Sequence, residues 1–184
     1  MSGSMVPDRA RGHPGPMDYL FFTTGPRGDV AAPAPGFRVE AWRPSPLRPL
    51  RRGLPAIPFA WWSLCDLAGL FAPGDYRVVL LHGKEGPVHR TCLLPAHYRF
   101  PFMAPGDVQA AAIWTRPDLR GRGVASAGLA AAMALVPDRR VWCMVREDNA
   151  ASIRLAGKAG FTLHARGRRM PGWLPGFLRP FQLL

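Results

Sequence analysis

Apolar and polar positions form short, regular patterns along most of this chain. Residues 37–42 alternate between the two kinds, which predicts a half-buried strand. Short apolar runs bounded by turn residues predict five further strands, at residues 76–82, 88–94, 108–115, 140–145 and 161–168. The aromatic stretch at residues 98–103 either extends the second of these runs or lines a pocket.

Three segments between the strands have helical composition. Residues 59–71 contain no helix breaker apart from Gly69, and residues 123–136 are rich in alanine and end before Pro137. A shorter helix is expected at residues 149–159, with Asn149 as its N-cap. Antiparallel strands thus come first and a strand–helix–strand–helix–strand half follows. This order predicts an α/β fold with a mixed sheet.

Proline and glycine, 21 and 20 in number, gather toward both ends and mark the domain borders. Residues 1–36 are interpreted as an irregular arm with at most a short strand at residues 19–22, and residues 1–4 resemble a cloning remnant. The domain itself is expected at residues 37–170. It is interrupted by a basic connection at residues 43–58 with five prolines and four arginines. The apolar, proline-broken tail at residues 171–184 either completes the sheet or leaves that place to a partner subunit.

The balance of charged residues favours an anionic partner. The 24 lysines and arginines outweigh 12 acidic residues and leave a net charge of +12. Nucleic acid, an acidic membrane and a phosphorylated small molecule would each suit this charge, and so would a simple compositional bias of the genome. A nucleic-acid-binding module is disfavoured because the arginines are scattered and no zinc-finger spacing is present.

Cysteine usage and hydropathy suggest where the protein works. Cys65, Cys92 and Cys143 show no CxxC spacing, so a disulfide framework and a structural zinc site are not expected. No apolar run reaches the length of about 18 residues needed for a membrane span, and residues 1–16 lack the apolar core of a secretory signal. We therefore expect a cytoplasmic protein without a metal.

The most informative stretch is the strand-to-helix corner at residues 107–125. Gly121 and Gly123 let the backbone approach a ligand closely, and the first turn of the following helix has free N–H groups that point into the corner. Arg120 and Arg122 add full positive charges, so the corner suits a pyrophosphate. It contains neither the Gly-Lys-Ser/Thr of a P-loop nor a G-x-G-x-x-G fingerprint. An ordinary strand–turn–helix connection is the alternative.

Two motifs at a family-like spacing give this region a resemblance. Arg120-Gly-Arg-Gly-Val-Ala125 resembles the pyrophosphate loop, Gln/Arg-x-x-Gly-x-Gly/Ala, of the GNAT acyltransferases. The run that joins Asn149 and Ser152 to Lys158-x-Gly160-Phe161 resembles their second cofactor segment. The resemblance covers residues 108–168 by motif and residues 37–103 by strand order alone.

The resemblance implies both the fold and the cofactor. The fold would be a single domain with a mixed, mostly antiparallel twisted sheet, flanking helices and a V-shaped split between the parallel strands 108–115 and 140–145. Acetyl-coenzyme A would be the co-substrate, and its thioester would enter the split. The implied cofactor-binding residues are Ile113, Trp114, Thr115, Leu119, Arg120, Gly121, Arg122, Gly123, Val124, Ala125, Asn149 and Ser152.

The implied reaction is a direct attack of an amine on the thioester. Many family members have a tyrosine seven residues after the Asn as a proton donor, and Ala156 stands there in this chain. His97 is the first candidate for the base, followed by His89, with Asp107 and Glu147 as further options, because histidine titrates nearest neutrality. Tyr98 is the candidate acid. Each of these histidines could equally be a surface or edge-strand residue.

The acceptor is expected to be a small-molecule amine. The basic residues 43–52 would suit an anionic acceptor such as a nucleotide-linked amino sugar, unless they form a solvated loop. Two other functions stay open: a non-catalytic acyl-coenzyme-A-binding relative, which the missing tyrosine suggests, and a basic nucleic-acid-binding module. A homodimer is also left open.

Overall fold

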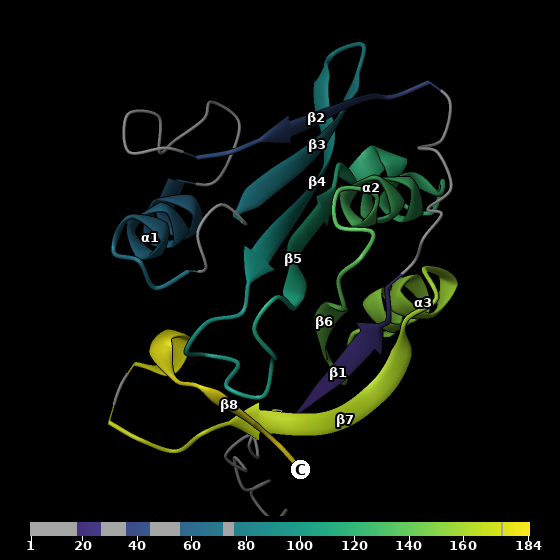
Figure 1. The fold of residues 1–184 in the computed structure, drawn as a ribbon. Helices are drawn as coiled ribbons and strands as arrows, with labels where there is room; N and C mark the ends of the chain where they lie inside the picture. The colour runs from purple at the N-terminus through teal and green to yellow at the C-terminus, as the bar shows by residue number, and fades with distance from the viewer. Residues whose placement is uncertain (1–17, 27–35, 45–55, 72–75, 174) are drawn as a thin grey trace, which may run out of the picture.

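The computed structural model describes residues 18–26, 36–44, 56–71, 76–173 and 175–184. These residues form one eight-stranded sheet with three α-helices and two short 3-10 helices (Figure 1). In chain order the elements are β1 (Tyr19–Thr24), β2 (Arg38–Trp42), α1 (Ala56–Leu67), β3 (Arg77–Gly83), β4 (Gly86–Pro95), β5 (Val108–Thr115), η1 (Pro117–Leu119), α2 (Val124–Met133), β6 (Val141–Arg146), α3 (Ala150–Lys158), β7 (Thr162–Arg169), η2 (Gly176–Leu178) and β8 (Phe181–Leu183).

The predicted α/β fold with a mixed sheet is confirmed. The strand order is β2-β3-β4-β5-β6-β1-β7-β8, and every neighbouring pair is antiparallel except β5 and β6. Each strand and helix expected from the sequence pattern is present, with ends shifted by a few residues. Helix α1 begins at Ala56 rather than at residue 59, because a proline such as Pro58 is tolerated in the first turn of a helix.

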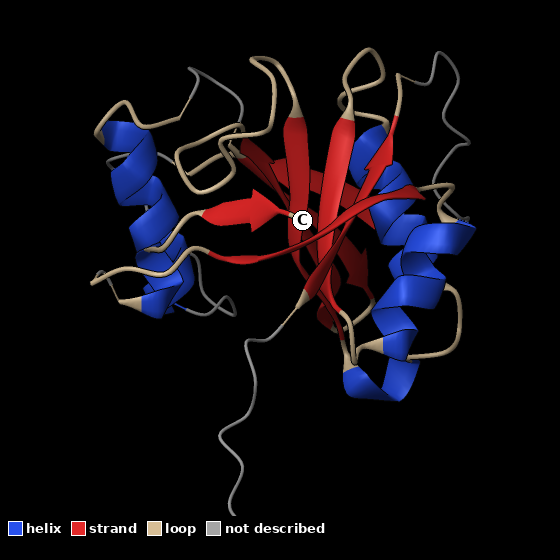
Figure 2. Ribbon diagram, turned by 90° about the horizontal axis from the view of Figure 1, so that it is seen from below, coloured by secondary structure: helices blue, strands red, loops and turns tan. Residues whose placement is uncertain are grey.

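The helices cover both faces of the sheet (Figures 1 and 2). Successive residues of a strand point to opposite faces, and β3 shows this clearly. Val78 and Leu80 belong to the cluster under α1, whereas Val79 and Leu81 pack in the cluster under α2. Helix α1 therefore lies on one face, which we call the α1 face, and α2 and α3 lie on the other.

The apolar patch near the N-terminus has a larger role than the sequence suggested. Residues 19–22 were expected in an irregular arm with at most a short strand, outside a domain beginning at residue 37. In the structure, β1 pairs with β6 on one side and with β7 on the other. Tyr19, Leu20, Phe21 and Phe22 are buried because both faces of this inner strand are covered.

The C-terminal tail supplies the last strand. β8 pairs with β7, and the N–H of Phe181 donates to the carbonyl of Arg99 at 2.8 Å. The rings of Phe100 and Phe181 stack with centroids 5.2 Å apart. The aromatic stretch at residues 98–103 thus lies in the loop between β4 and β5, where it packs against the tail and does not extend β4.

The three cysteines are buried and unpaired, as expected of small apolar residues. Within the described ranges, no helix is both long enough and apolar enough to cross a bilayer. The same part of the chain has no group of three His, Cys, Asp or Glu side chains arranged to hold a metal ion.

Candidate functional site

The sheet opens between its two parallel strands. β5 and β6 pair only over three positions, where residues 108–110 face residues 141–143. Beyond Ala110 and Cys143 the two strands have no mutual pairing, so backbone groups of residues 111–115 face a gap in the sheet. The predicted V-shaped split is therefore present, and it opens toward the C-terminal ends of both strands.

A bulge in β5 shapes one wall of this split. The register between β4 and β5 shifts between Arg90 and Cys92, so one extra residue is inserted in β5. At the bulge, Ala112 has φ +48°, a left-handed conformation that costs energy in a residue with a Cβ. The Nε–H of Arg90 donates to the carbonyl of Ala112 at 3.2 Å, and the Arg90 guanidinium carbon lies 5.7 Å from the ring centre of Trp114. Arg90 thus holds the bulge from the neighbouring strand.

The corner after β5 has the geometry of an anion site. Gly121 and Gly123 have φ of +76° and +80°, and a Cβ at either position would meet no atom within 4 Å. Glycine is therefore required by the backbone angle and not by crowding, and the space beside both residues stays open. Gly123 precedes Val124 as the N-cap of α2, so the first N–H groups of that helix face the corner.

Charged side chains hold the corner in place through a hydrogen bond and two ion pairs. The Nε–H of Arg120 donates to the carbonyl of Thr115 at 3.2 Å, which folds this side chain back along the end of β5. Arg116 forms ion pairs with Asp118 at 2.8 Å and with Glu85 at 3.3 Å. These contacts fix the direction in which the chain enters the corner.

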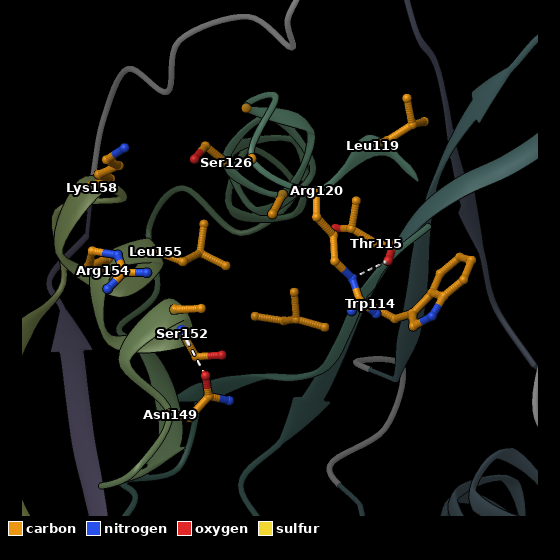
Figure 3. Close-up of a pocket in the computed structure, with 15 residues that line it drawn as sticks. Trp114, Thr115, Leu119, Arg120, Ser126, Asn149, Ser152, Arg154, Leu155 and Lys158 are labelled. Atoms are coloured by element: carbon orange, nitrogen blue, oxygen red, sulfur yellow. Dashed lines mark hydrogen bonds between the residues drawn. The ribbon is translucent and has the colours of Figure 1, made fainter. Parts of the chain in front are cut away.

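A cavity of about 560 Å³ connects the corner with the split. Trp114, Thr115 and Arg120 lie on one side of it, and Asn149 and Ser152 on α3 lie on the other (Figure 3). The side chain of Asn149 accepts from the N–H of Ser152 at 3.1 Å, so Asn149 is the N-cap that the sequence predicted. The full lining is Ile113, Trp114, Thr115, Leu119, Arg120, Gly121, Gly123, Ala125, Ser126, Asn149, Ala151, Ser152, Arg154, Leu155 and Lys158.

Ten of the twelve predicted cofactor residues thus line one cavity, and two do not. Val124 is buried against the core beneath α2, and Arg122 is exposed and does not line the cavity. The sequence reasoning missed Ser126 and four positions on α3. The sequence pattern could have identified the four α3 positions, because Ala151, Arg154, Leu155 and Lys158 are spaced as one face of a helix.

His89 is a structural residue and not an accessible base. Its side chain is 0% exposed, and its ring nitrogens lie 2.8 Å from the hydroxyls of Thr115 and Thr91. Burial, aided by the charge of Arg90, lowers the pKa of His89 to about 4, so the ring is neutral at physiological pH. The prediction of His89 as a candidate base is therefore corrected, because its side chain points inward beneath α2.

His97 and Tyr98 lie together, but apart from the cavity at the corner. Both line a second cavity of about 350 Å³ in the loop between β4 and β5, and the two cavities share no residue. Nδ1 of His97 lies 2.9 Å from the carbonyl of Pro95, which can only accept, so Nδ1 carries the proton and Nε2 the lone pair. Burial lowers the pKa of His97. The second cavity lies beside the closed end of the split, about 13 Å along β5 from the bulge at Ala112.

The remaining candidates for proton transfer are engaged elsewhere. Asp107 is buried and accepts from the Trp142 indole N–H at 2.7 Å and from the Ala104 N–H at 3.0 Å. Glu147 pairs with Arg166 at 3.0 Å. Ala156, at the position where a tyrosine was looked for, is 1% exposed in the core beneath α3. The basic residues 45–52, considered as an acceptor wall, lie outside the described residues.

Comparison with known sequences agrees with this geometry. Residues 41–161, about two thirds of the chain, match the family model described as the acetyltransferase (GNAT) family. No curated protein matches the chain.

Solved structures share the fold at low sequence identity. A GNAT-family protein from Novosphingobium aromaticivorans has a TM-score of 0.50 and 18% identity over 82% of this chain and 61% of that one. An acetyltransferase from Colwellia psychrerythraea has a TM-score of 0.52 and 13% identity over 82% and 53% of the two chains. A functionally unknown protein from Staphylococcus epidermidis has a TM-score of 0.53 and 7% identity over 82% and 59%. The chain thus spans at most 61% of the length of these three proteins, and the likeness concerns the fold.

Proposed function

The chain belongs to the GNAT acetyltransferase family, and on that premise we propose that it transfers an acetyl group from acetyl-coenzyme A to an amine of a small molecule. The observation that carries the proposal is the cavity joining the corner at Gly121 and Gly123 to the unpaired stretch of β5. The pantetheine arm of acetyl-coenzyme A would join a diphosphate at the corner to a thioester in the split. The cavity runs between these two places.

The residues present fit coenzyme A by their chemistry. Free N–H groups at the start of α2, together with Arg120, would hold the pyrophosphate. Arg154 and Lys158 on α3 add two cations to the same cavity, which suits a ligand with more than one phosphate. The edge of β5 at Ile113, Trp114 and Thr115 would pair with the amide groups of the pantetheine arm. Asn149 and Ser152 would contact this arm from the opposite wall.

Acetyl-coenzyme A supplies an activated acyl group, and the chain must orient it and stabilise charge. Backbone N–H groups beside the bulge would donate to the thioester oxygen, and one such donor is worth about 3 kcal/mol of transition-state stabilisation. The amine nitrogen would bond to the carbonyl carbon as the carbon–sulfur bond breaks, coenzyme A would leave as the thiolate, and the amine proton would pass to a base or to water. Holding both reactants at the split supplies a large part of the rate.

Proton transfer in this chain would differ from that of relatives with a tyrosine at the position of Ala156. A thiolate can leave without a proton donor, so the reaction does not require that tyrosine. Of the candidates for proton transfer, His97 keeps an unprotonated ring nitrogen, and Tyr98 is 40% exposed. Both stay candidates, and His97→Asn tests the first through the acidic limb of the pH–rate profile.

A non-catalytic, coenzyme-A-binding protein is the second candidate function. The observation that favours it is the buried Ala156, which leaves no hydroxyl at that position. Turnover separates the two functions, because only an enzyme releases free thiol from acetyl-coenzyme A in the presence of amines.

The test combines binding with turnover. Acetyl-coenzyme A at about 100 times its Kd should add about 2.7 kcal/mol to the free energy of unfolding and raise the melting temperature by several degrees. Arg120→Glu should abolish this rise. Binding together with thiol release across an amine panel supports the enzyme, and binding without release supports the second candidate. The absence of any rise at millimolar acetyl-coenzyme A would refute both.

A further inference from the structure

Two arginines from distant parts of the chain converge on one aromatic ring at the end of β7. Arg99 lies in the loop between β4 and β5, and Arg169 is the last residue of β7. Their guanidinium carbons lie 5.4 Å and 5.1 Å from the ring centre of Phe181. The ring of Phe100 lies 5.8 Å from Arg99, and that of Tyr19 lies 5.8 Å from Arg169.

Among the residues that the structure describes, this arginine pair has no counter-ion. Nε of Arg99 is buried and has no hydrogen-bond partner, and neither arginine forms an ion pair with an acidic side chain in the described part of the chain. Arg169 donates to the hydroxyl of Tyr19 at 3.4 Å and to the carbonyl of Gly176, both neutral groups. A buried donor without an acceptor is rare and destabilises the folded protein.

The surroundings of Arg99 also destabilise its charged form. Burial lowers the pKa of Arg99, and the positive charge of Arg169 lowers it further. Cation–π contacts with the rings offset only part of this cost. An anion bound at the pair would give Nε of Arg99 an acceptor and offset the repulsion between the two charges. Carboxylates and phosphates match the planar fork of arginine best.

The pair lies on the α1 face of the sheet. Tyr19 and Phe181 belong to the cluster that includes Trp142 and Met144, whereas Cys143 and Val145 point toward α2 and α3. The arginines are thus on the α1 face, opposite the cavity at the corner. Two strand spacings separate β7 from β6 across β1, a distance of about 10 Å.

We propose that Arg99 and Arg169 bind the anionic group, a carboxylate or a phosphate, of the amine acceptor. The assignment to an acceptor rests on the proposed function, whereas the anion site itself does not. An acceptor with an amine at the split and an anionic group at least about 10 Å away would span the two places, because two strand spacings separate β7 from β6.

The first experiment measures anion binding by the full chain. The melting temperature is followed with inorganic phosphate and, separately, with glutarate, at an ionic strength held constant with sodium chloride. Arg99→Met and Arg169→Met keep the apolar stems, and Arg168→Met removes an exposed neighbouring charge as the matched control. All four proteins have the same corner at Gly121. Anion binding there would raise their melting temperatures equally and would not change the differences between them.

The expected rise in melting temperature is the same for the wild type and Arg168→Met, and at least twofold smaller for Arg99→Met and Arg169→Met. Without added anion, Arg99→Met should melt no lower than the wild type, because an unpaired charge has been removed. An equal response of all four proteins would overturn the site. A larger rise with phosphate than with glutarate would indicate a phosphate site, and the reverse would indicate a carboxylate site.

The second experiment tests the assignment to the acceptor. Thiol release from acetyl-coenzyme A is compared for 6-aminohexanoate against hexylamine, and for 6-aminohexyl phosphate against 6-aminohexanol. Arg99→Met should lower kcat/KM at least tenfold for one anionic amine and leave its neutral counterpart within twofold. Equal losses for both members of each pair would overturn the acceptor role. If no amine reacts, the proposed enzymatic function fails along with the acceptor role, and the first experiment still decides whether the anion site exists.

Discussion

Nδ1 of His89 lies 2.8 Å from the hydroxyl oxygen of Thr115, in the interior between β4, β5 and α2. The other ring nitrogen contacts Thr91, and the ring lies directly under Gly128 of α2. The carbonyl of Thr115 in turn accepts from Arg120 at the corner. This buried histidine therefore links the sheet, the helix and the base of the candidate pyrophosphate loop.

The first prediction concerns the space between His89 and α2. A Cβ at position 128 would lie 2.0 Å from the imidazole ring, so Gly128→Ala must displace either α2 or a ring held by two hydrogen bonds. We expect a loss of about 3 kcal/mol in the free energy of unfolding, measured by urea denaturation. Gly157→Ala is the control, because its Cβ meets nothing within 4 Å and alanine favours a helix by about 1 kcal/mol. Equal stability of the two variants would contradict the packing described.

The second prediction is a pH dependence of stability. The pKa of His89 is about 4 in the folded protein and near its ordinary value of 6.5 in the unfolded chain. The unfolded chain therefore binds a proton more readily between these values, and stability is lost as the pH falls from 6.5 to 4. The loss is about 3 kcal/mol, and His89 adds no slope above pH 7.

The measurement compares urea unfolding of the wild type and His89→Gln at pH 7.5 and pH 4.5. His97, whose pKa is also lowered, contributes a slope of the same sign to both proteins, so the difference between them isolates His89. The stability advantage of the wild type should shrink by about 2–3 kcal/mol at the lower pH. An advantage that is independent of pH would show that His89 is not neutral in the folded protein.

The third prediction separates two neighbouring arginines of the corner. Arg120 lines the cavity, whereas Arg122 is exposed and does not. Arg120→Gln should raise the Kd for coenzyme A about tenfold, because a hydrogen bond to a charged group is worth about 1.5 kcal/mol or more. Arg122→Gln should change the Kd less than threefold. Isothermal titration checks both values, and equal effects would mean that the charge acts only at long range.

The fourth prediction concerns the bulge of β5. Arg90→Met removes the hydrogen bond to the carbonyl of Ala112, and the bulge is then free to relax. Because this contact orients backbone donors and not the corner, kcat should fall about tenfold. The Kd for coenzyme A should stay within twofold of the wild type.

A second substitution tests whether the effect acts through the backbone. Glycine accepts the φ of +48° at position 112 without strain, so Ala112→Gly should restore part of the kcat lost in Arg90→Met. A fall in Kd and kcat together, with no recovery in the double variant, would show that Arg90 acts in some other way.

Elements and motifs were predictable where the responsible interactions are local. The glycines of the corner, the N-cap Asn149 and the Ala-rich α2 act through backbone angles and hydrogen bonds within a few residues. For that reason their positions could be inferred from the chain alone. The ten predicted residues that line the cavity were inferred instead from the resemblance to the GNAT family, and six of them lie in its two motifs.

The sequence by itself determined the α/β class, the chain order of the elements from β2 to β7 and the glycine-bearing corner, because each depends on short-range periodicity and turn chemistry. Only the tertiary structure placed β1 between β6 and β7, enclosed His89 beneath Gly128 and brought Arg99 beside Arg169. In each case the partners lie far apart along the chain and meet through sheet pairing and side-chain packing. The roles of these residues follow from burial and neighbouring charge, which depend on the complete fold.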